Sequence, residues 1–239
     1  FYQTLTRSTP SALNKALFPW LKSLYPIWSK LTPEDIKIST KLSIAELLLS
    51  GCTTTSDHHY VFPEGLEDAL AIQYEEIVDS GIRATITRGS MCLGEEDGGL
   101  PPQTVIQSED EIIRSSESAI TKFHDASPGA MVQVALAPCS PFSVTEEIML
   151  GIADLAQKSG VRTHTHLADT EDETIFCKES FGLSPLDYLE KVNWLNDRTW
   201  LAHGIYFSDE EIDRLGKSKV GITHCPTSNM ILCSGICPV

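Results

Sequence analysis

Residues 161–169 read Val-Arg-Thr-His-Thr-His-Leu-Ala-Asp, an apolar and β-branched run that ends in polar side chains. This composition predicts a strand over 161–167. Thr145 is placed to cap a helix that ends before Gly160, and a helical pattern with a break at Pro185 runs on to about residue 192. A strand between two helices predicts a βαβ unit and therefore a parallel sheet.

The same alternation extends in both directions along the chain. Further strands are predicted over 52–57, 82–89, 131–137, 199–205 and 220–224. Further helices are predicted over 33–50, 66–80, 109–125 and 208–216. Strands and helices that alternate in this way indicate an α/β fold. We expect a (β/α)8 TIM barrel whose strands 2 to 7 are present and whose first and eighth strands are missing, as a single incomplete catalytic domain over 1–239. A doubly wound sheet is the competing fold, but no Gly-x-Gly-x-x-Gly follows a strand.

Polar side chains collect where the predicted strands end. His164 and His166 close the strand over 161–167, His203 lies near the end of the next strand, and His224 closes the last. The carboxyl ends of barrel strands form one rim, where active sites lie. His164 and His166 are two positions apart and so point to the same side of the sheet. Because neutral imidazole suits zinc, we expect His166 and His203 to converge on a metal site, although either alone would more simply be a hydrogen-bonded core residue.

Charge and cysteine content narrow the functional classes. The chain has 33 acidic and 18 basic residues and a net charge of -15, which argues against a nucleic-acid partner. Its seven cysteines form no Cys-x-x-Cys pair, which favours free thiols in a cytoplasmic protein. No apolar run is long enough to cross a membrane. The chain starts at Phe1 without a leader pattern, so we expect it to begin inside a longer one.

Several blocks along the chain carry a family resemblance: 1–7 (Phe-Tyr-Gln-Thr-Leu-Thr-Arg), 20–28, 45–54, 137–145, 163–168 (Thr-His-Thr-His-Leu-Ala), 200–204 (Trp-Leu-Ala-His-Gly) and 224–230 (His-Cys-Pro-Thr-Ser-Asn-Met). Together they resemble the 8-oxoguanine deaminases of the amidohydrolase superfamily, in the branch that also holds guanine deaminases and triazine hydrolases. The resemblance covers essentially the whole chain. It implies a TIM-barrel, metal-dependent hydrolase with one divalent metal ion, usually zinc, and a small purine or related heterocycle as substrate.

The resemblance also implies roles for particular residues. His166 falls on a metal ligand. His203 falls on a residue that ligates the metal or hydrogen-bonds its bound water, which makes it a catalytic residue as well. Gln3 falls on a glutamine that reads the purine edge. His224 and Asn229 fall on a motif that lines the same pocket and binds substrate.

One position departs from the family pattern. The related motif is His-Leu-Ala-Glu, and Asp169 stands where its glutamate moves a proton from water to the ring and then to the leaving amine. An aspartate is one methylene shorter, and general acid–base catalysis needs hydrogen-bond reach of about 2.6–3.2 Å. A functioning and an impaired Asp169 therefore both remain open. The implied reaction is hydrolytic deamination of 8-oxoguanine to urate and ammonia, with water acidified by the metal ion.

Other interpretations compete with this one. The substrate could instead be guanine, isoxanthopterin or a hydroxytriazine, or the chain could be an inactive truncated copy. The family's His-x-His motif and final aspartate ligand would lie before Phe1 and after Val239, outside this sequence. The aromatic residues Trp20, Tyr25 and Trp28 suggest a lid or a subunit contact, which leaves a homo-oligomer open.

Overall fold

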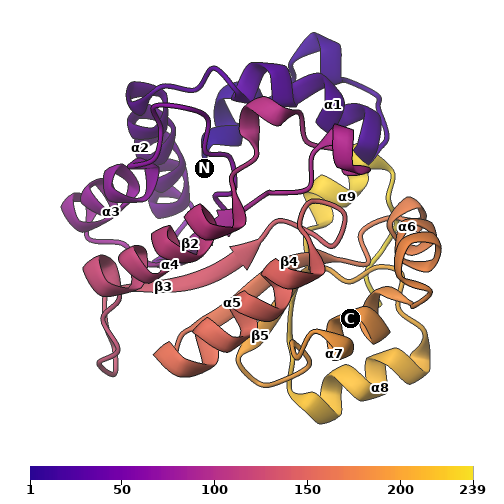
Figure 1. Ribbon diagram of the computed structural model, residues 1–239. Coiled ribbons are helices and arrows are strands. Elements are labelled where there is room, and N and C mark those ends of the chain that lie inside the picture. The colour runs from indigo at the N-terminus through magenta and orange to yellow at the C-terminus, as the bar shows by residue number, and fades with distance from the viewer. Residues whose placement is uncertain (239) are drawn as a thin grey trace.

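The computed structural model describes residues 1–238, and within that span the strands form one parallel sheet in the sequential order β1-β2-β3-β4-β5-β6 (Figure 1). The strands are β1 (Thr54–Asp57), β2 (Arg83–Ser90), β3 (Val132–Pro138), β4 (Arg162–Leu167), β5 (Thr199–His203) and β6 (Gly221–Thr223). The predicted parallel α/β sheet is confirmed. A doubly wound sheet is excluded, because the strand order of that fold reverses near its middle.

Helices alternate with these strands as predicted. They are α1 (Leu17–Trp28), α2 (Pro33–Leu49), α3 (Ala69–Ser80), α4 (Glu109–Phe123), α5 (Glu146–Ser159), α6 (Glu171–Phe181), α7 (Pro185–Lys191), α8 (Asp209–Ser218) and α9 (Pro226–Leu232). Short 3-10 turns are η1 (Tyr2–Thr6), η2 (Pro10–Ala12), η3 (Glu95–Asp97) and η4 (Gln103–Val105). Helices α1 and α9 are not anticipated by the sequence patterns above.

Local capping explains where the predicted helices begin and end. Thr145 accepts a hydrogen bond from a backbone amide of α5, and Ser208 forms a capping box with Glu211 at the start of α8. Gly81 and Gly160 end α3 and α5 in the left-handed conformation that glycine adopts without strain. The strand ends were less predictable, and β6 stops one residue before His224.

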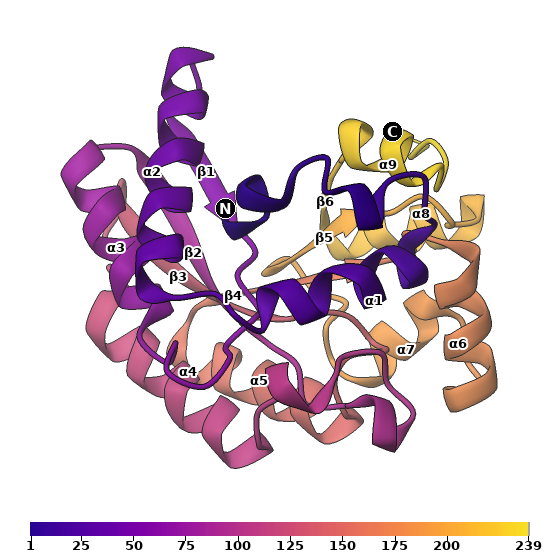
Figure 2. The same ribbon diagram turned by 90° about the horizontal axis from the view of Figure 1, so that it is seen from above.

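Two groups of buried apolar side chains hold the layers together. One joins the helices α2 and α3 to β2 and β3, and includes Ile77, Ile86 and Val134. The other joins α5 and α7 to β4 and β5, and includes Ile152 and Leu201. Figure 2 shows α3, α4 and α5 running along the outside of the strands. The sheet is thereby anchored on its helical side, which leaves the carboxyl ends of the strands to build a site.

The N-terminal segment and α1 pack over those carboxyl ends (Figure 2). The ring of Phe18 in α1 lies 5.1 Å from that of Phe142, just beyond β3. Tyr25 and Trp28 are at most 1% exposed. These two rings cannot form a subunit contact, so that alternative is wrong for them, and they are instead the core of the segment that covers the strand ends.

Replacing Trp28 by alanine is expected to lower the free energy of unfolding by about 3–5 kcal/mol, the usual cost of truncating a buried aromatic side chain. The indole is fully buried and packs edge-on against Tyr2, with a centroid distance of 5.3 Å. Urea denaturation measures the change. Ile27→Ala, at a neighbouring residue that is 39% exposed, is the control. Equal losses in the two variants would contradict the assignment of Trp28 to the core.

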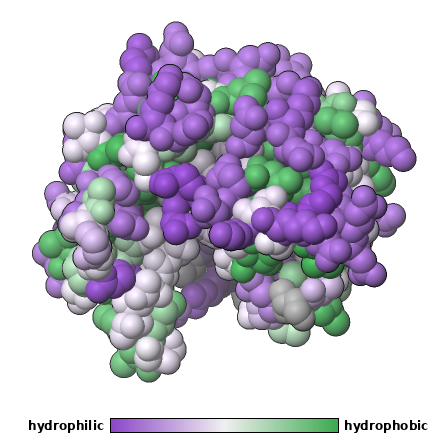
Figure 3. Space-filling model, turned by 90° about the horizontal axis from the view of Figure 1, so that it is seen from below, coloured by the Kyte–Doolittle hydropathy of each residue, from purple (hydrophilic) through white to green (hydrophobic). Residues whose placement is uncertain are grey.

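The surface is mainly polar. Figure 3 shows one face on which hydrophilic residues predominate and apolar residues form separate patches. Over residues 1–238, none of the helices is both long enough and apolar enough to span a bilayer.

Candidate active site

Four histidines gather at the carboxyl ends of β1, β4 and β5. The ring of His58 stacks on that of His166 at 4.5 Å and contacts that of His164, also at 4.5 Å. The ring of His166 in turn lies 5.4 Å from that of His203. The structure therefore brings together His166 and His203, as expected for neighbouring strands, and places His164 and His166 on the same side of the sheet.

Backbone carbonyl groups fix the orientation of these rings. His166 Nδ1 lies 2.7 Å from the carbonyl oxygen of Cys139. A carbonyl only accepts hydrogen bonds, so Nδ1 carries the hydrogen and Nε2 keeps its lone pair, the arrangement found in metal-binding histidines. Burial lowers the pKa of His166 to about 4, which keeps the imidazole neutral at pH 7. His164 is held in a similar way, by the carbonyl oxygen of Trp200 at 2.9 Å.

Asp169 and His203 form a second cluster with Asn229. The carboxylate atom Asp169 Oδ1 lies 3.2 Å from His203 Nδ1 and 3.3 Å from Asn229 Nδ2. Asn229 Nδ2 also lies 3.0 Å from Ser234 Oγ and 3.0 Å from His203 Nδ1. Nδ1 of His203 therefore faces both the carboxyl group of Asp169 and the amide group of Asn229.

Burial shapes the charge state of this pair. It lowers the pKa of His203 to about 4 and raises the pKa of Asp169. Both shifts oppose ionisation, because a charged group loses its hydration in the interior. The imidazole of His203 is therefore neutral at pH 7, and the carboxyl group of Asp169 beside it holds a proton more readily than an exposed aspartate does.

The backbone near Asp169 and at His203 is strained, and the segments that follow β4 and β5 are hydrogen-bonded to each other. Ala168 and His203 have φ values of 54° and 76°, in the left-handed region that costs a non-glycine residue energy. The Gly204 amide donates to the Leu167 carbonyl oxygen at 3.1 Å, and the Ile205 amide donates to that of Ala168 at 2.8 Å. The ends of β4 and β5 thus hold each other in unusual conformations, which is common where side chains must be aimed at a ligand.

Glu173 is an additional buried acid next to this cluster. Its side chain is fully buried in α6, and Oε2 accepts a hydrogen bond from the Asp169 backbone amide at 2.9 Å. Sequence reasoning missed Glu173, although its position three residues after the Thr170 cap is a recognised place for a capping acid. Nor was His58 assigned to the site, although it directly follows the end of β1.

Replacing Glu173 by glutamine should change how the free energy of unfolding depends on pH. Burial raises the pKa of Glu173 to about 8, so above its ordinary pKa the folded state keeps a proton that the unfolded state releases. The contribution of Glu173 to stability is therefore complete below its ordinary pKa. It declines by about 1.4 kcal/mol for each further pH unit until the pH passes about 8. Urea unfolding at about pH 5 and about pH 9 should show a larger fall in the wild type than in Glu173→Gln. A fall of the same size in both would contradict this prediction.

The remaining predicted site residues lie in different surroundings. Gln3 Nε2 donates to the hydroxyl of Tyr60 at 3.0 Å, and the Tyr60 ring lies 5.8 Å from that of His166. Gln3 is thereby tied to the histidine cluster. His224 is exposed and lies one residue beyond the end of β6. Asn229 is 3% exposed and contacts His203 and Asp169 directly.

Arg88, near the end of β2, has a structural role. Its guanidinium group donates to Ser115 Oγ and Gln107 Oε1, both at 2.7 Å, and lies 4.0 Å above the Phe62 ring. It is 3% exposed. These contacts tie loops and α4 together and leave the side chain little freedom to meet a substrate.

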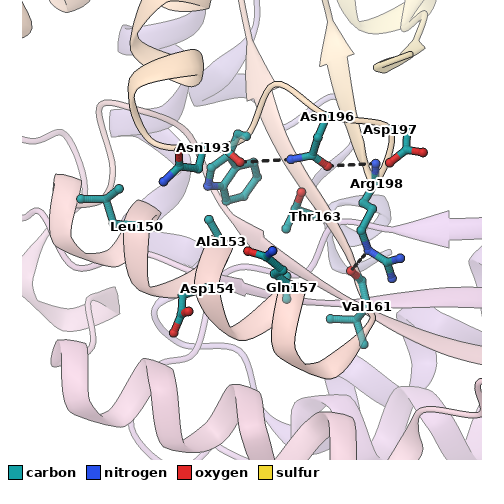
Figure 4. Close-up of a pocket in the computed structure, with 12 residues that line it drawn as sticks. Leu150, Ala153, Asp154, Gln157, Val161, Thr163, Asn193, Asn196, Asp197 and Arg198 are labelled. Carbon is teal, nitrogen blue, oxygen red and sulfur yellow. Dashed lines mark hydrogen bonds between the residues drawn. The ribbon is translucent and has the colours of Figure 1, made fainter. Parts of the chain in front are cut away.

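A cavity of about 360 Å³ lies at the opposite end of the strands, near the starts of β4 and β5 (Figure 4). Two of its polar side chains are bonded to backbone carbonyl groups. Asn196 Nδ2 donates to the Asn193 carbonyl oxygen at 3.0 Å, and Arg198 Nε donates to the Val161 carbonyl oxygen at 3.0 Å. Because these contacts connect the chain to itself, we interpret the cavity as a packing feature and place the candidate active site at the histidine cluster.

The metal-binding capacity of the cluster is partial. Nε2 of the neutral rings of His166 and His203 fits a divalent ion such as zinc. Among residues 1–238, however, no three or more side chains of His, Cys, Asp or Glu are grouped closely enough to hold a metal ion.

Comparisons of the sequence with known proteins agree with one another. A profile of the amidohydrolase family matches residues 1–239. The chain is 58% identical over 238 residues to the 8-oxoguanine deaminase of Pseudomonas aeruginosa, covering 100% of this chain and 53% of that one. It is 32% identical over 242 residues to an isoxanthopterin deaminase from an unknown prokaryotic organism, covering 100% of this chain and 50% of that one.

The fold has close counterparts among solved structures. The atrazine chlorohydrolase of Arthrobacter aurescens, crystallised with zinc, superposes with a TM-score of 0.94 at 27% identity. The match covers 99% of this chain and 54% of that one. This chain thus spans about half the length of the relatives that it matches.

Proposed function

This chain belongs to the amidohydrolase family, and we propose that it supplies the central strands of an active site that hydrolyses free 8-oxoguanine to urate and ammonia. The identity of 58% over the whole chain to an 8-oxoguanine deaminase is the observation that supports this most strongly. The gathering of His166, His203 and Asp169 at one rim provides the groups that such a reaction needs.

We propose that His166 and His203 take part in holding one divalent metal ion, which we take to be zinc. Nδ1 of His166 is engaged by the Cys139 carbonyl oxygen, and Nδ1 of His203 is engaged by Asp169 and Asn229, which leaves Nε2 of each ring for the ion. A bound divalent ion lowers the pKa of a coordinated water molecule to about 7 and so supplies a nucleophile at neutral pH. The other ligands would come from outside the described residues.

Residues of this chain would then handle the proton and the substrate. Asp169 would accept a proton from the attacking water and deliver it to the ring nitrogen, and would then carry a second proton, from the hydroxyl group added to the ring carbon, to the amine that leaves as ammonia. Where His203 does not ligate the ion, its Nε2 would instead donate a hydrogen bond to the attacking oxygen and oppose the charge that develops on it. The amide nitrogen of Gln3 is engaged by Tyr60, so its oxygen is left to accept a hydrogen bond from a purine N–H. His224 is a further proposed substrate contact.

The same reasoning suggests a cellular setting. A small heterocyclic substrate needs no nucleic-acid surface, which is consistent with a net charge of -15. All seven cysteines are free, as is usual in the reducing cytoplasm. We therefore propose a cytoplasmic enzyme acting on a free base. Isoxanthopterin is the second candidate substrate, because the isoxanthopterin deaminase also matches the whole chain.

A substrate panel tests the proposal. The protein, at the full length of its relatives and loaded with zinc, is assayed for ammonia release from 8-oxoguanine, guanine, isoxanthopterin and a hydroxytriazine. We expect the highest kcat/KM with 8-oxoguanine, together with formation of urate. A preference for isoxanthopterin would move the assignment to the second candidate, and ammonia release from none of the four would refute the proposed function.

A further inference from the structure

The carboxylate of Asp169 is held by contacts from elements other than its own. On its side-chain end, Oδ1 meets His203 of β5 and the amide of Asn229 in α9, at 3.2 and 3.3 Å. On its backbone end, the Asp169 amide donates to Glu173 of α6 at 2.9 Å. Because Asp169 is itself 3% exposed, this side chain has no room to adopt another position without displacing one of these partners.

Glu173 is a costly residue in purely structural terms. Its side chain is fully buried, its carboxyl group accepts a hydrogen bond from the Asp169 amide through Oε2, and Oε1 has no partner among the described residues. Burying a carboxyl group without full hydrogen bonding destabilises a fold by about 1–3 kcal/mol. An apolar side chain would fill the same space at lower cost, so the contact to Asp169 is the feature that distinguishes a glutamate here.

Asn229 is used in a comparable way. It is 3% exposed, and its Nδ2 group lies between the carboxylate of Asp169 and the hydroxyl of Ser234, at 3.3 and 3.0 Å. Its own Oδ1 has no hydrogen-bond partner within residues 1–238. The same Nδ2 group lies 3.0 Å from His203 Nδ1. The amide is therefore engaged with Asp169, His203 and Ser234 together and is not free to meet a ligand through its donor atoms.

We propose that Glu173 and Asn229 are positioning residues that clamp Asp169 at both ends, so that its short carboxylate stays where proton transfer occurs. The inference rests on the proposed function, because it concerns the same carboxylate. It also decides between the two alternatives that the sequence leaves open: Asp169 is a working group whose reach is set by its surroundings, not an impaired remnant of a longer side chain. A displacement of about 1 Å at such a group can lower a rate about 100-fold.

Kinetic analysis of the zinc-loaded, full-length protein tests the backbone end of the clamp. Glu173→Asp keeps the carboxyl group but is one methylene too short to reach the Asp169 amide, and we expect kcat to fall about 10- to 100-fold with KM and zinc content unchanged. Glu173→Gln keeps an acceptor oxygen and should retain kcat. Glu171→Asp, an identical change at an exposed residue of α6, is the control. An unchanged kcat in Glu173→Asp, or equal losses in Glu173→Asp and Glu173→Gln, would overturn the clamp.

Asp169→Glu tests whether the short side chain of Asp169 limits kcat. If Asp169 were an impaired copy, restoring the longer side chain would raise kcat. In a clamped and buried site the extra methylene must displace Asn229 or His203, so we expect kcat to fall. Asn229→Ala should lower kcat as well, whereas Thr227→Ala at an exposed position of the same helix should not. A rise in kcat for Asp169→Glu would contradict the proposal.

Amide hydrogen exchange separates this inference from the proposed function. In Glu173→Asp the Asp169 amide loses its buried acceptor, so its exchange should accelerate at least about tenfold relative to Glu171→Asp. This measurement needs no substrate. If the wild type releases no ammonia from any of the four substrates, the proposed function fails, while exchange still decides the clamp. Equal exchange rates in the two variants would refute the clamp whatever the activity.

Discussion

His166→Phe is expected to deprive the full-length protein of its bound metal ion and, with it, of its deaminase activity. The ring of His166 is oriented by the Cys139 carbonyl oxygen at 2.7 Å, so that Nε2 is left as a ligand. Losing a residue that merely supports a ligand weakens metal binding about 10- to 100-fold, and losing a ligand itself should cost more. Phenylalanine preserves the stacking on His58 and His203, so the fold should survive.

Metal content per chain, measured by elemental analysis, checks this result directly. His164→Phe is the matched control, because it lies on the same strand and the same side and stacks on Trp200 at 4.5 Å. His164 is not one of the proposed metal ligands, and the variant should keep its zinc. Full zinc content in His166→Phe, or equal loss in both variants, would show that the ion is held elsewhere.

Asp169→Asn should have the second largest effect, a fall in kcat of about 10²- to 10⁴-fold, the usual contribution of a general acid–base group. An amide has nearly the same size as the carboxylate and keeps an oxygen for Asn229 and His203, but it cannot carry a proton. KM and zinc content should therefore change little. Steady-state kinetics with 8-oxoguanine give both constants.

The control for this variant is Asp172→Asn, an identical change at an exposed position in the first turn of α6. It should behave as the wild type. If Asp169→Asn retained normal kcat, proton transfer would have to be assigned to another group, and Glu173, which is fully buried beside it, would become the first candidate.

The sequence shows that His58 follows a strand and that Glu173 follows a helix cap. Nothing near either residue in the sequence reveals which groups it contacts in the folded protein. His58 Nε2 bonds to the carbonyl oxygen of Ala137, 79 positions away, at 2.9 Å. Asn229 contacts Asp169 across 60 positions. Contacts over such separations exist only once the sheet has formed.

Helix α1 was not predicted from the sequence for a related reason. Helix α1 contains Pro26 and is apolar on several sides, so its pattern lacks the polar face that marks a surface helix. It forms because Trp28 and Tyr25 pack against Tyr2 and the strand ends, a tertiary effect. The exposed position of His224 likewise follows from where β6 stops, one residue earlier than its apolar pattern predicts.

What the amino-acid order determined by itself is the succession of strands and helices, the capped ends of most helices, and the placement of His166 and His203 at neighbouring strand ends. Those features depend on hydrophobic period, on capping hydroxyls and on left-handed glycines such as Gly160, all of which act between residues a few positions apart. The tertiary structure alone decided which histidine nitrogens are left free and what holds Asp169 in place. Burial and hydrogen-bond partners set both, and they come from segments that are distant in the chain.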